Sequence, residues 1–263
     1  MLGLKEIREK YQSPWYEKKK INNIFSRYFY TTIATVLVKF ILPTKITANQ
    51  ITVSWVILGF LGCLLFTAGN YWVSILAVLI IQLHVVLDYV DGPIARARNK
   101  KSFKGIYIER VGHDLIYTIY FFCIAVGSLR HGFDPVLILI LGFCASLGGF
   151  FYKHARRAKI YCSLTFKKNT PANSTALEGQ AGNMKVSNKN KPSFARRIYR
   201  SSLIVWEPVF FTAVSLVLAI FDRLYFLPIF YGLTYPVHFV LSYVYQARMA
   251  DKEVDKLTDM TGD

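Results

Sequence analysis

The sequence predicts an all-α integral membrane protein, a bundle of six transmembrane helices preceded by an amphipathic interfacial helix. The 263 residues are 53% apolar and yet carry a formal net charge of +16. A membrane protein reconciles these values by placing apolar runs in lipid and charges outside it. Six apolar runs have the roughly 18–22 residues that cross a bilayer. They fall at residues 51–68, 71–90, 106–128, 135–152, 203–221 and 225–245.

The positive charges are concentrated on one side of these runs. Of the 32 Lys and Arg residues, nine precede the first run, five lie in residues 96–104, twelve in 153–200 and three follow the last run. The connections on the other side contain only Arg130 and Arg223. The positive-inside rule therefore predicts that both termini are cytoplasmic.

Three regions are expected along the chain. Residues 1–46 form a cytoplasmic and interfacial segment, because 21–42 mix apolar side chains with Arg27 and Lys39. Residues 47–248 form the membrane domain. It includes a mobile cytoplasmic loop at about 163–195, where large apolar residues are almost absent. Residues 249–263 form a cytoplasmic tail.

Acidic residues near the cytoplasmic ends of the second and third runs form a candidate metal site. Asp88 and Asp91 are three residues apart and share one helix face, and Glu109 and His113 share another. Three carboxylates at one membrane depth require compensating cations. Oxygen ligands suit Mg²⁺ or Mn²⁺. Two such ions would keep a residual positive charge that attracts a diphosphate.

Residues beside the acidic pair suit the binding of a flat, anionic molecule. Gly92 permits close approach of the backbone, and Ala95 keeps the same helix face low. Arg96 can hold a phosphate or a neighbouring carboxylate. A basic rim between the two helices would attract an anionic substrate; it consists of Arg98, Lys100, Lys101 and Lys104.

The segment from Asp88 to Asp114 resembles the CDP-alcohol phosphotransferase signature, D-x2-D-G-x2-A-R-x8-G-x3-D-x3-D. The positions that match in type and spacing are Asp88, Asp91, Gly92, Ala95, Arg96 and Gly105. The third acidic position is Glu109, and the fourth is His113, with Asp114 displaced by one residue. Residues 47–52, TANQIT, are similar to the family's T-P-N-x-x-T entry to its first helix. The resemblance covers about residues 47–114.

The resemblance implies an enzyme in which an acceptor hydroxyl attacks the β-phosphorus of a CDP-alcohol and CMP is released. The product would be a phospholipid or a phosphodiester-linked lipid or glycan precursor. Carried over, Asp88, Asp91, Glu109 and His113 would bind two divalent ions. His113 would also be the general base, and Asp114 is the second catalytic candidate, as a replacement for the lost carboxylate. Many members are homodimers, which the resemblance also implies.

A nucleotide pocket is implied by the matched positions. Its expected residues are Asn49, Thr52, Asp88, Gly92, Ala95, Arg96 and Gly105. Helix capping is the alternative for Asn49 and Thr52. Arg156 and Arg157 follow the fourth run and are candidates for a phosphate of the acceptor or lipid, although positive-inside charge explains them equally well. Trp55, Trp72 and Trp206 are expected in the interfacial aromatic belt.

Other functions stay open. A prenyl-diphosphate transferase also uses aspartates with Mg²⁺, but normally in two motifs far apart in sequence. A small transporter or an inactive homologue is a further alternative, although no inverted repeat supports transport. Nucleic acid is not an expected partner, because the charge lies beside the apolar runs and no nucleic-acid-binding motif occurs. The expected partners are a CDP-alcohol donor, membrane lipids and an alcohol, sugar-alcohol or lipid acceptor.

Overall fold

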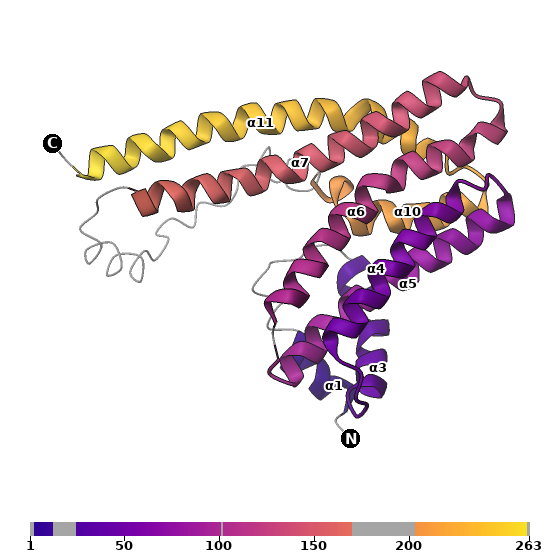
Figure 1. The fold of residues 1–263 in the computed structure, drawn as a ribbon, viewed down its shortest axis with the longest axis horizontal. Helices are drawn as coiled ribbons and strands as arrows, with labels where there is room; N and C mark the ends of the chain where they lie inside the picture. The colour runs from indigo at the N-terminus through magenta and orange to yellow at the C-terminus, as the bar shows by residue number, and fades with distance from the viewer. Residues whose placement is uncertain (1–2, 13–24, 101, 170–202, 262–263) are drawn as a thin grey trace. The chain divides into compact units, whose positions relative to one another are not determined.

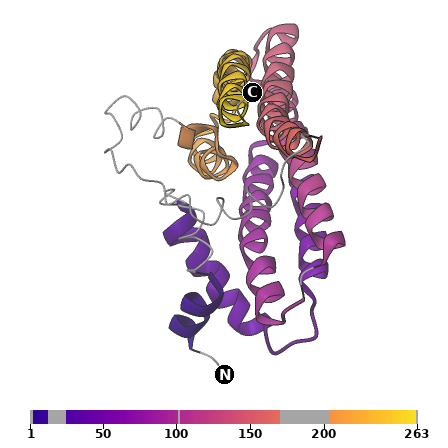
Figure 2. The same ribbon diagram turned by 90° about the vertical axis from the view of Figure 1, so that its left-hand side faces the viewer.

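The computed structural model describes residues 3–12, 25–100, 102–169 and 203–261, and within them every regular element is helical (Figures 1 and 2). The all-α prediction is therefore confirmed for the described residues. The elements are α1 (Leu4–Ile7), η1 (Arg8–Gln12), η2 (Phe25–Tyr30), α3 (Thr31–Ile41), α4 (Ala48–Phe66), α5 (Tyr71–Ala97), α6 (Phe103–Gly127), η3 (Ser128–His131), α7 (Pro135–Asn169), η4 (Leu203–Trp206), α10 (Pro208–Ile220) and α11 (Phe226–Thr261).

Five described helices are long and apolar enough to cross a membrane, which indicates a multi-pass membrane protein. They are Ala48–Phe66, Tyr71–Ala97, Phe103–His131, Pro135–Ala155 and Phe226–Ala247. The predicted run at 203–221 differs, because Glu207 is extended and Pro208 begins a helix of only 13 residues, α10. Such a helix is about 20 Å long, whereas the hydrocarbon core is about 30 Å thick. Six long spans were predicted, and five are found among the described residues.

The chain divides into two compact units. The first consists of Met1–Phe150 with Ile204–Pro236, and the second of Phe151–Leu203 with Val237–Asp263. In the second unit, α7 and α11 contact each other through Tyr152 and His238, whose ring centroids are 4.7 Å apart. α7 continues to Asn169, past the predicted start of the mobile loop near residue 163. The rest of that predicted loop, up to residue 195, lies outside the described residues.

In the first unit, α4 packs against both α5 and α6, and α3 and α10 pack against α5 (Figure 1). Hydrogen-bonding side chains set the starts of these helices. Thr47 and Gln50 form a reciprocal capping box at α4, Asn70 caps α5 through the amides of residues 72 and 73, and Ser102 caps α6. Packing of α4 against α5 and α6 brings the beginnings of α4 and α6 and the end of α5 to one region.

The amino-terminal helix α3 is amphipathic, as predicted, but its less bulky side faces the protein. Ala34, Thr35 and Val38 are buried, whereas Ile33 and Phe40 are exposed. Packing against α5 therefore selects the small side chains, and the bulky apolar ones face outward. Placement of this helix at the membrane interface stays a prediction.

Gly127 allows the end of α6 to touch the end of α4. A Cβ atom at this position would lie 2.0 Å from the backbone oxygen of Phe66, so backbone would have to move. We expect Gly127→Ala to lower the free energy of unfolding by about 2 kcal/mol, measured by thermal unfolding in detergent. Gly149→Ala is the matched control, because its Cβ would meet only Tyr235 at 3.4 Å. Equal melting temperatures for the two variants would contradict the prediction.

Candidate active site

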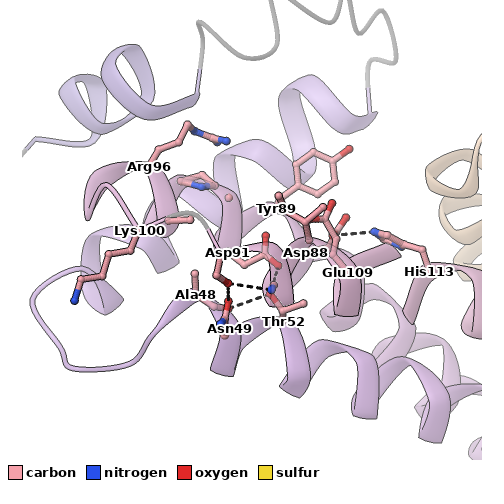
Figure 3. Close-up of a pocket in the computed structure, with 16 residues that line it drawn as sticks. Ala48, Asn49, Thr52, Asp88, Tyr89, Asp91, Arg96, Lys100, Glu109 and His113 are labelled. Carbon is pink, nitrogen blue, oxygen red and sulfur yellow. Dashed lines mark hydrogen bonds and ion pairs between the residues drawn. The ribbon is translucent and has the colours of Figure 1, made fainter. Parts of the chain in front are cut away.

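A cavity of about 440 Å³ lies between the beginnings of α4 and α6 and the end of α5 (Figure 3). Its volume falls in the usual range for small-molecule sites, about 300–1,000 Å³. The cavity is lined by Ala48, Asn49, Thr52, Asp88, Tyr89, Asp91, Gly92, Pro93, Ala95, Arg96, Lys100, Ser102, Gly105, Ile106, Glu109 and His113. Acidic and basic side chains thus share one space, which suits a charged ligand.

Asp88, Glu109 and His113 form a group that can hold a metal ion. One ligand atom from each lies within 4.8 Å of the others. The Asp88 Oδ1 and His113 Nε2 atoms are 3.1 Å apart, and both side chains are about three-quarters buried. Figure 3 shows the three side chains pointing toward one another from α5 and α6. The two carboxylates supply the oxygen ligands that suit a divalent ion such as Mg²⁺ or Mn²⁺.

Asp91 lines the same cavity but is not in this three-residue group. Its side chain is buried, and its Oδ2 accepts two hydrogen bonds from α4. The Thr52 hydroxyl donates at 2.7 Å and the Trp55 indole Nε1 at 2.9 Å. A buried carboxylate requires such donors, because desolvation otherwise opposes its charge. The second of the two predicted ions, which would need Asp91, stays a prediction.

Trp55 is not part of an exposed aromatic belt, so that prediction is wrong for this residue. Its side chain is 0% exposed, whereas Trp72 is 74% exposed. The Trp55 ring centroid lies 4.7 Å from that of His113, and His113 also stacks on Tyr117 at 5.5 Å. Trp55 therefore contacts both Asp91 and His113. Its position three residues after Thr52, on the same helix face, is the signal that could have indicated this.

A buried histidine, His84, contacts both Trp55 and Tyr117. His84 Nδ1 lies 3.0 Å from the Trp55 carbonyl oxygen, and its Nε2 lies 3.4 Å from the Tyr117 hydroxyl. If Nδ1 donates to the carbonyl, Nε2 accepts from the hydroxyl, so one neutral tautomer satisfies both contacts. His84 thus holds the two residues whose rings contact His113.

Another part of the cavity wall is formed by Asn49, Ser102 and Gly105. The Ser102 hydroxyl donates to Asn49 Oδ1 at 3.0 Å and accepts from the Gly105 amide at 3.0 Å. A Cβ at Gly105 would lie 2.4 Å from Asn49 Oδ1, so glycine permits this close approach. All seven residues predicted for the nucleotide pocket line the cavity. Ser102, Tyr89, Pro93 and Ile106 were not predicted, because they belong to no position of the signature.

Other predicted residues are not brought to the cavity. Asp114 is partly buried on α6 but does not line it. Arg157 belongs to the second unit, and the side chain of Arg156 lies outside the described residues, so their phosphate-binding role stays a prediction.

The predicted basic rim is only partly formed. Lys100 lines the cavity. Arg98 instead donates to backbone carbonyls between α3 and α4: Thr44 at 2.7 Å, Leu42 at 3.3 Å, Ile41 at 3.4 Å, and Ile46. The role predicted for Arg98 in the rim is therefore corrected to holding this connection. Lys101 lies outside the described residues.

The hydrogen bond from Trp55 to Asp91 can be tested by substitution. Trp55→Phe keeps an aromatic ring beside His113 but removes the indole donor to Asp91. We expect the affinity for Mn²⁺ at the predicted second site, which includes Asp91, to fall about tenfold to a hundredfold, as for other groups that orient metal ligands. Calorimetric titration of the purified protein in detergent measures it. Trp72→Phe makes the same change at an exposed position, and an equal affinity in both variants would contradict the prediction.

Comparison with models of known families matches residues 40–177 to the model described as CDP-alcohol phosphatidyltransferase. This region is more than half of the chain and includes the elements that form the cavity, α4, α5 and α6. A search of curated proteins found no match.

Proposed function

The chain belongs to the CDP-alcohol phosphatidyltransferase family, and on this premise we propose that it transfers a phospho-alcohol group from a CDP-alcohol to an acceptor hydroxyl. CMP is the second product. The observation that carries the proposal is the group of Asp88, Glu109 and His113 in a cavity lined by every matched position of the signature. A family member that uses this chemistry needs an anion-binding, metal-binding pocket, and these residues have the required ligand types.

Asp88 and Glu109 would hold the metal ion, with Asp91 as the ligand to a second ion. When bound, Mg²⁺ or Mn²⁺ offsets the negative charge of a diphosphate and polarises its phosphoryl oxygens. Thr52 and Trp55 hold one oxygen of Asp91, so the orientation of this carboxylate is determined before any ligand arrives. Such preorganisation lowers the cost of binding.

His113 is proposed as the proton acceptor. Its Nδ1 is buried, whereas Nε2 lies 3.1 Å from Asp88 Oδ1, so Nε2 is the nitrogen that can meet a substrate. A neutral imidazole has one available lone pair, so Nε2 cannot bind a metal and accept a proton at the same time. During transfer we assign it to the proton. Asp88 Oδ1, 3.1 Å away, then stabilises the resulting imidazolium.

The reaction balances with this assignment. The acceptor hydroxyl loses its proton to His113 Nε2, and its oxygen forms a bond to the β-phosphorus. The bond from the β-phosphorus to the oxygen that bridges to the α-phosphorus breaks, and its electron pair leaves with CMP. We assign the Asn49, Ser102 and Gly105 wall to the nucleotide, since it lies in the same cavity as the acidic group.

One substrate is proposed to be a lipid, because the cavity lies at the ends of helices long enough to cross a membrane. The basic segments of the sequence support a cytoplasmic location for the cavity and both termini. The lipid is the CDP-linked donor or the hydroxyl acceptor. A panel of both kinds of donor decides between them.

The test is CMP release by the purified full-length protein in detergent, with CDP-diacylglycerol or water-soluble CDP-alcohols and a panel of acceptors. The panel contains glycerol phosphate, inositol phosphate, serine, diacylglycerol and a sugar alcohol. We expect CMP to appear only with a divalent ion and one matching acceptor, and chelation to stop it. Metal-dependent binding without CMP release would indicate an inactive homologue. Absence of both would overturn the proposed function.

A further inference from the structure

Residues 4–12 belong to the compact unit that carries the cavity, although they precede the region matched to the family. Ile7 is 1% exposed and belongs to the same buried apolar cluster as Val38 and Ile94. Gln12 is 0% exposed, and its Oε1 accepts a hydrogen bond from the Thr35 hydroxyl at 2.6 Å. Burial of a carboxamide is costly without such a bond. The segment therefore packs against α3 through specific contacts.

Arg96 connects this segment to the cavity. Its Nε donates to the backbone oxygen of Tyr11 at 2.7 Å, and its side chain lines the cavity. A Cβ at Gly92 would lie 3.2 Å from Arg96 Nη1, so the guanidinium group lies over the glycine that follows Asp91. Figure 3 shows Arg96 at the other end of the cavity from His113. A guanidinium held at Nε keeps its plane, whereas an unrestrained arginine samples many rotamers.

We propose that residues 4–12 act as a clamp that holds Arg96 in the orientation that meets the diphosphate of the substrate. Arg96 contacts the anion, and the clamp acts only by positioning it. The nature of the anion rests on the proposed function. Without the clamp, a guanidinium that is correctly placed about a tenth of the time would raise the apparent Kd about tenfold.

The test compares Kd values for cytidine 5′-diphosphate with Mg²⁺, measured by calorimetry on the full-length protein in detergent. Ile7→Asp removes the buried anchor, and we expect it to raise Kd about tenfold. Arg96→Gln is expected to raise Kd at least as much. The double variant should then bind no more weakly than Arg96→Gln, because both changes act on the same contact, the one between Arg96 and the diphosphate.

Leu4→Asp is the matched control, since Leu4 lies on the same short helix and is 44% exposed. We expect its Kd to stay within about twofold of the unmodified protein. Additive effects of Ile7→Asp and Arg96→Gln would overturn the clamp, as would an unchanged Kd for Ile7→Asp. If Ile7→Asp does not fold, deletion of residues 2–12 takes its place. The same tenfold rise in Kd is then expected, and an unchanged Kd would again overturn the clamp.

Hydrogen exchange without any nucleotide separates the clamp from the proposed function. If the unmodified protein does not bind cytidine diphosphate with Mg²⁺ or Mn²⁺, the proposed function fails. The clamp still predicts that the amides of residues 4–12 exchange faster in Arg96→Gln than in the unmodified protein, because the bond to Tyr11 is lost. Equal exchange in the two proteins would overturn the clamp.

Discussion

Asp88→Asn is expected to lower kcat/KM for CMP release about a thousandfold. The change keeps the shape of the side chain but removes the negative charge that faces both Glu109 and His113. Lewis-acid stabilisation by a bound ion amounts to several kcal/mol, and about 4 kcal/mol corresponds to this factor. The variant also loses the partner of the His113 imidazolium. Steady-state CMP release at saturating Mg²⁺ measures the effect.

Asp134→Asn makes the same chemical change away from the cavity. Asp134 caps α7 by accepting from the Leu137 amide at 2.8 Å, and asparagine caps helices equally well. We expect its kcat/KM to stay within about twofold of the unmodified protein. An Asp88→Asn variant that keeps activity close to that of Asp134→Asn would contradict the assignment of Asp88.

His113→Ala is expected to lower kcat about a thousandfold while the Kd for Mn²⁺ changes by less than about tenfold. General base catalysis contributes about a hundredfold to ten-thousandfold, and the carboxylates of Asp88 and Glu109 stay in place. CMP release and calorimetric Mn²⁺ binding measure the two quantities separately. A Kd raised more than a hundredfold would instead identify His113 as a metal ligand.

His113→Asp tests whether a carboxylate can take over the same role. We expect it to restore CMP release relative to His113→Ala, because aspartate is the residue of the family signature at this position. Steady-state CMP release by the two variants measures the restoration. Loss of activity in Asp114→Asn with an active His113→Ala would identify Asp114 as the base instead.

Much of the candidate site could be predicted from local spacing. Asp88 with Asp91 and Glu109 with His113 are each within one helical turn, so their side chains had to share faces once α5 and α6 formed. The structure brings three of these four together as a possible metal site. Asp91 differs because Thr52 and Trp55, 39 and 36 residues earlier, hold its carboxylate. The spacing of Thr52 and Trp55 places both on one face of α4, but only the packing of α4 against α5 brings that face to Asp91.

The predicted span at 203–221 shows that hydropathy alone does not predict the length of a helix. Its composition is apolar enough, but Pro208 starts a new helix after the extended Glu207, so the continuous helix is short. Arg98 shows that a run of basic residues does not by itself predict which side chains face the cavity. It lies in a basic run, yet its guanidinium meets carbonyls 52 to 57 residues away.

The apolar runs long enough to cross a bilayer and the spacing of the acidic residues could be read directly from the sequence. These features depend on helix pitch and nearby side chains, which are local properties. Three features came only from the packing of the helices: Trp55 is buried between Asp91 and His113, Arg98 holds a loop, and residues 4–12 reach Arg96. Such contacts join distant segments, and close packing of the helices selects them.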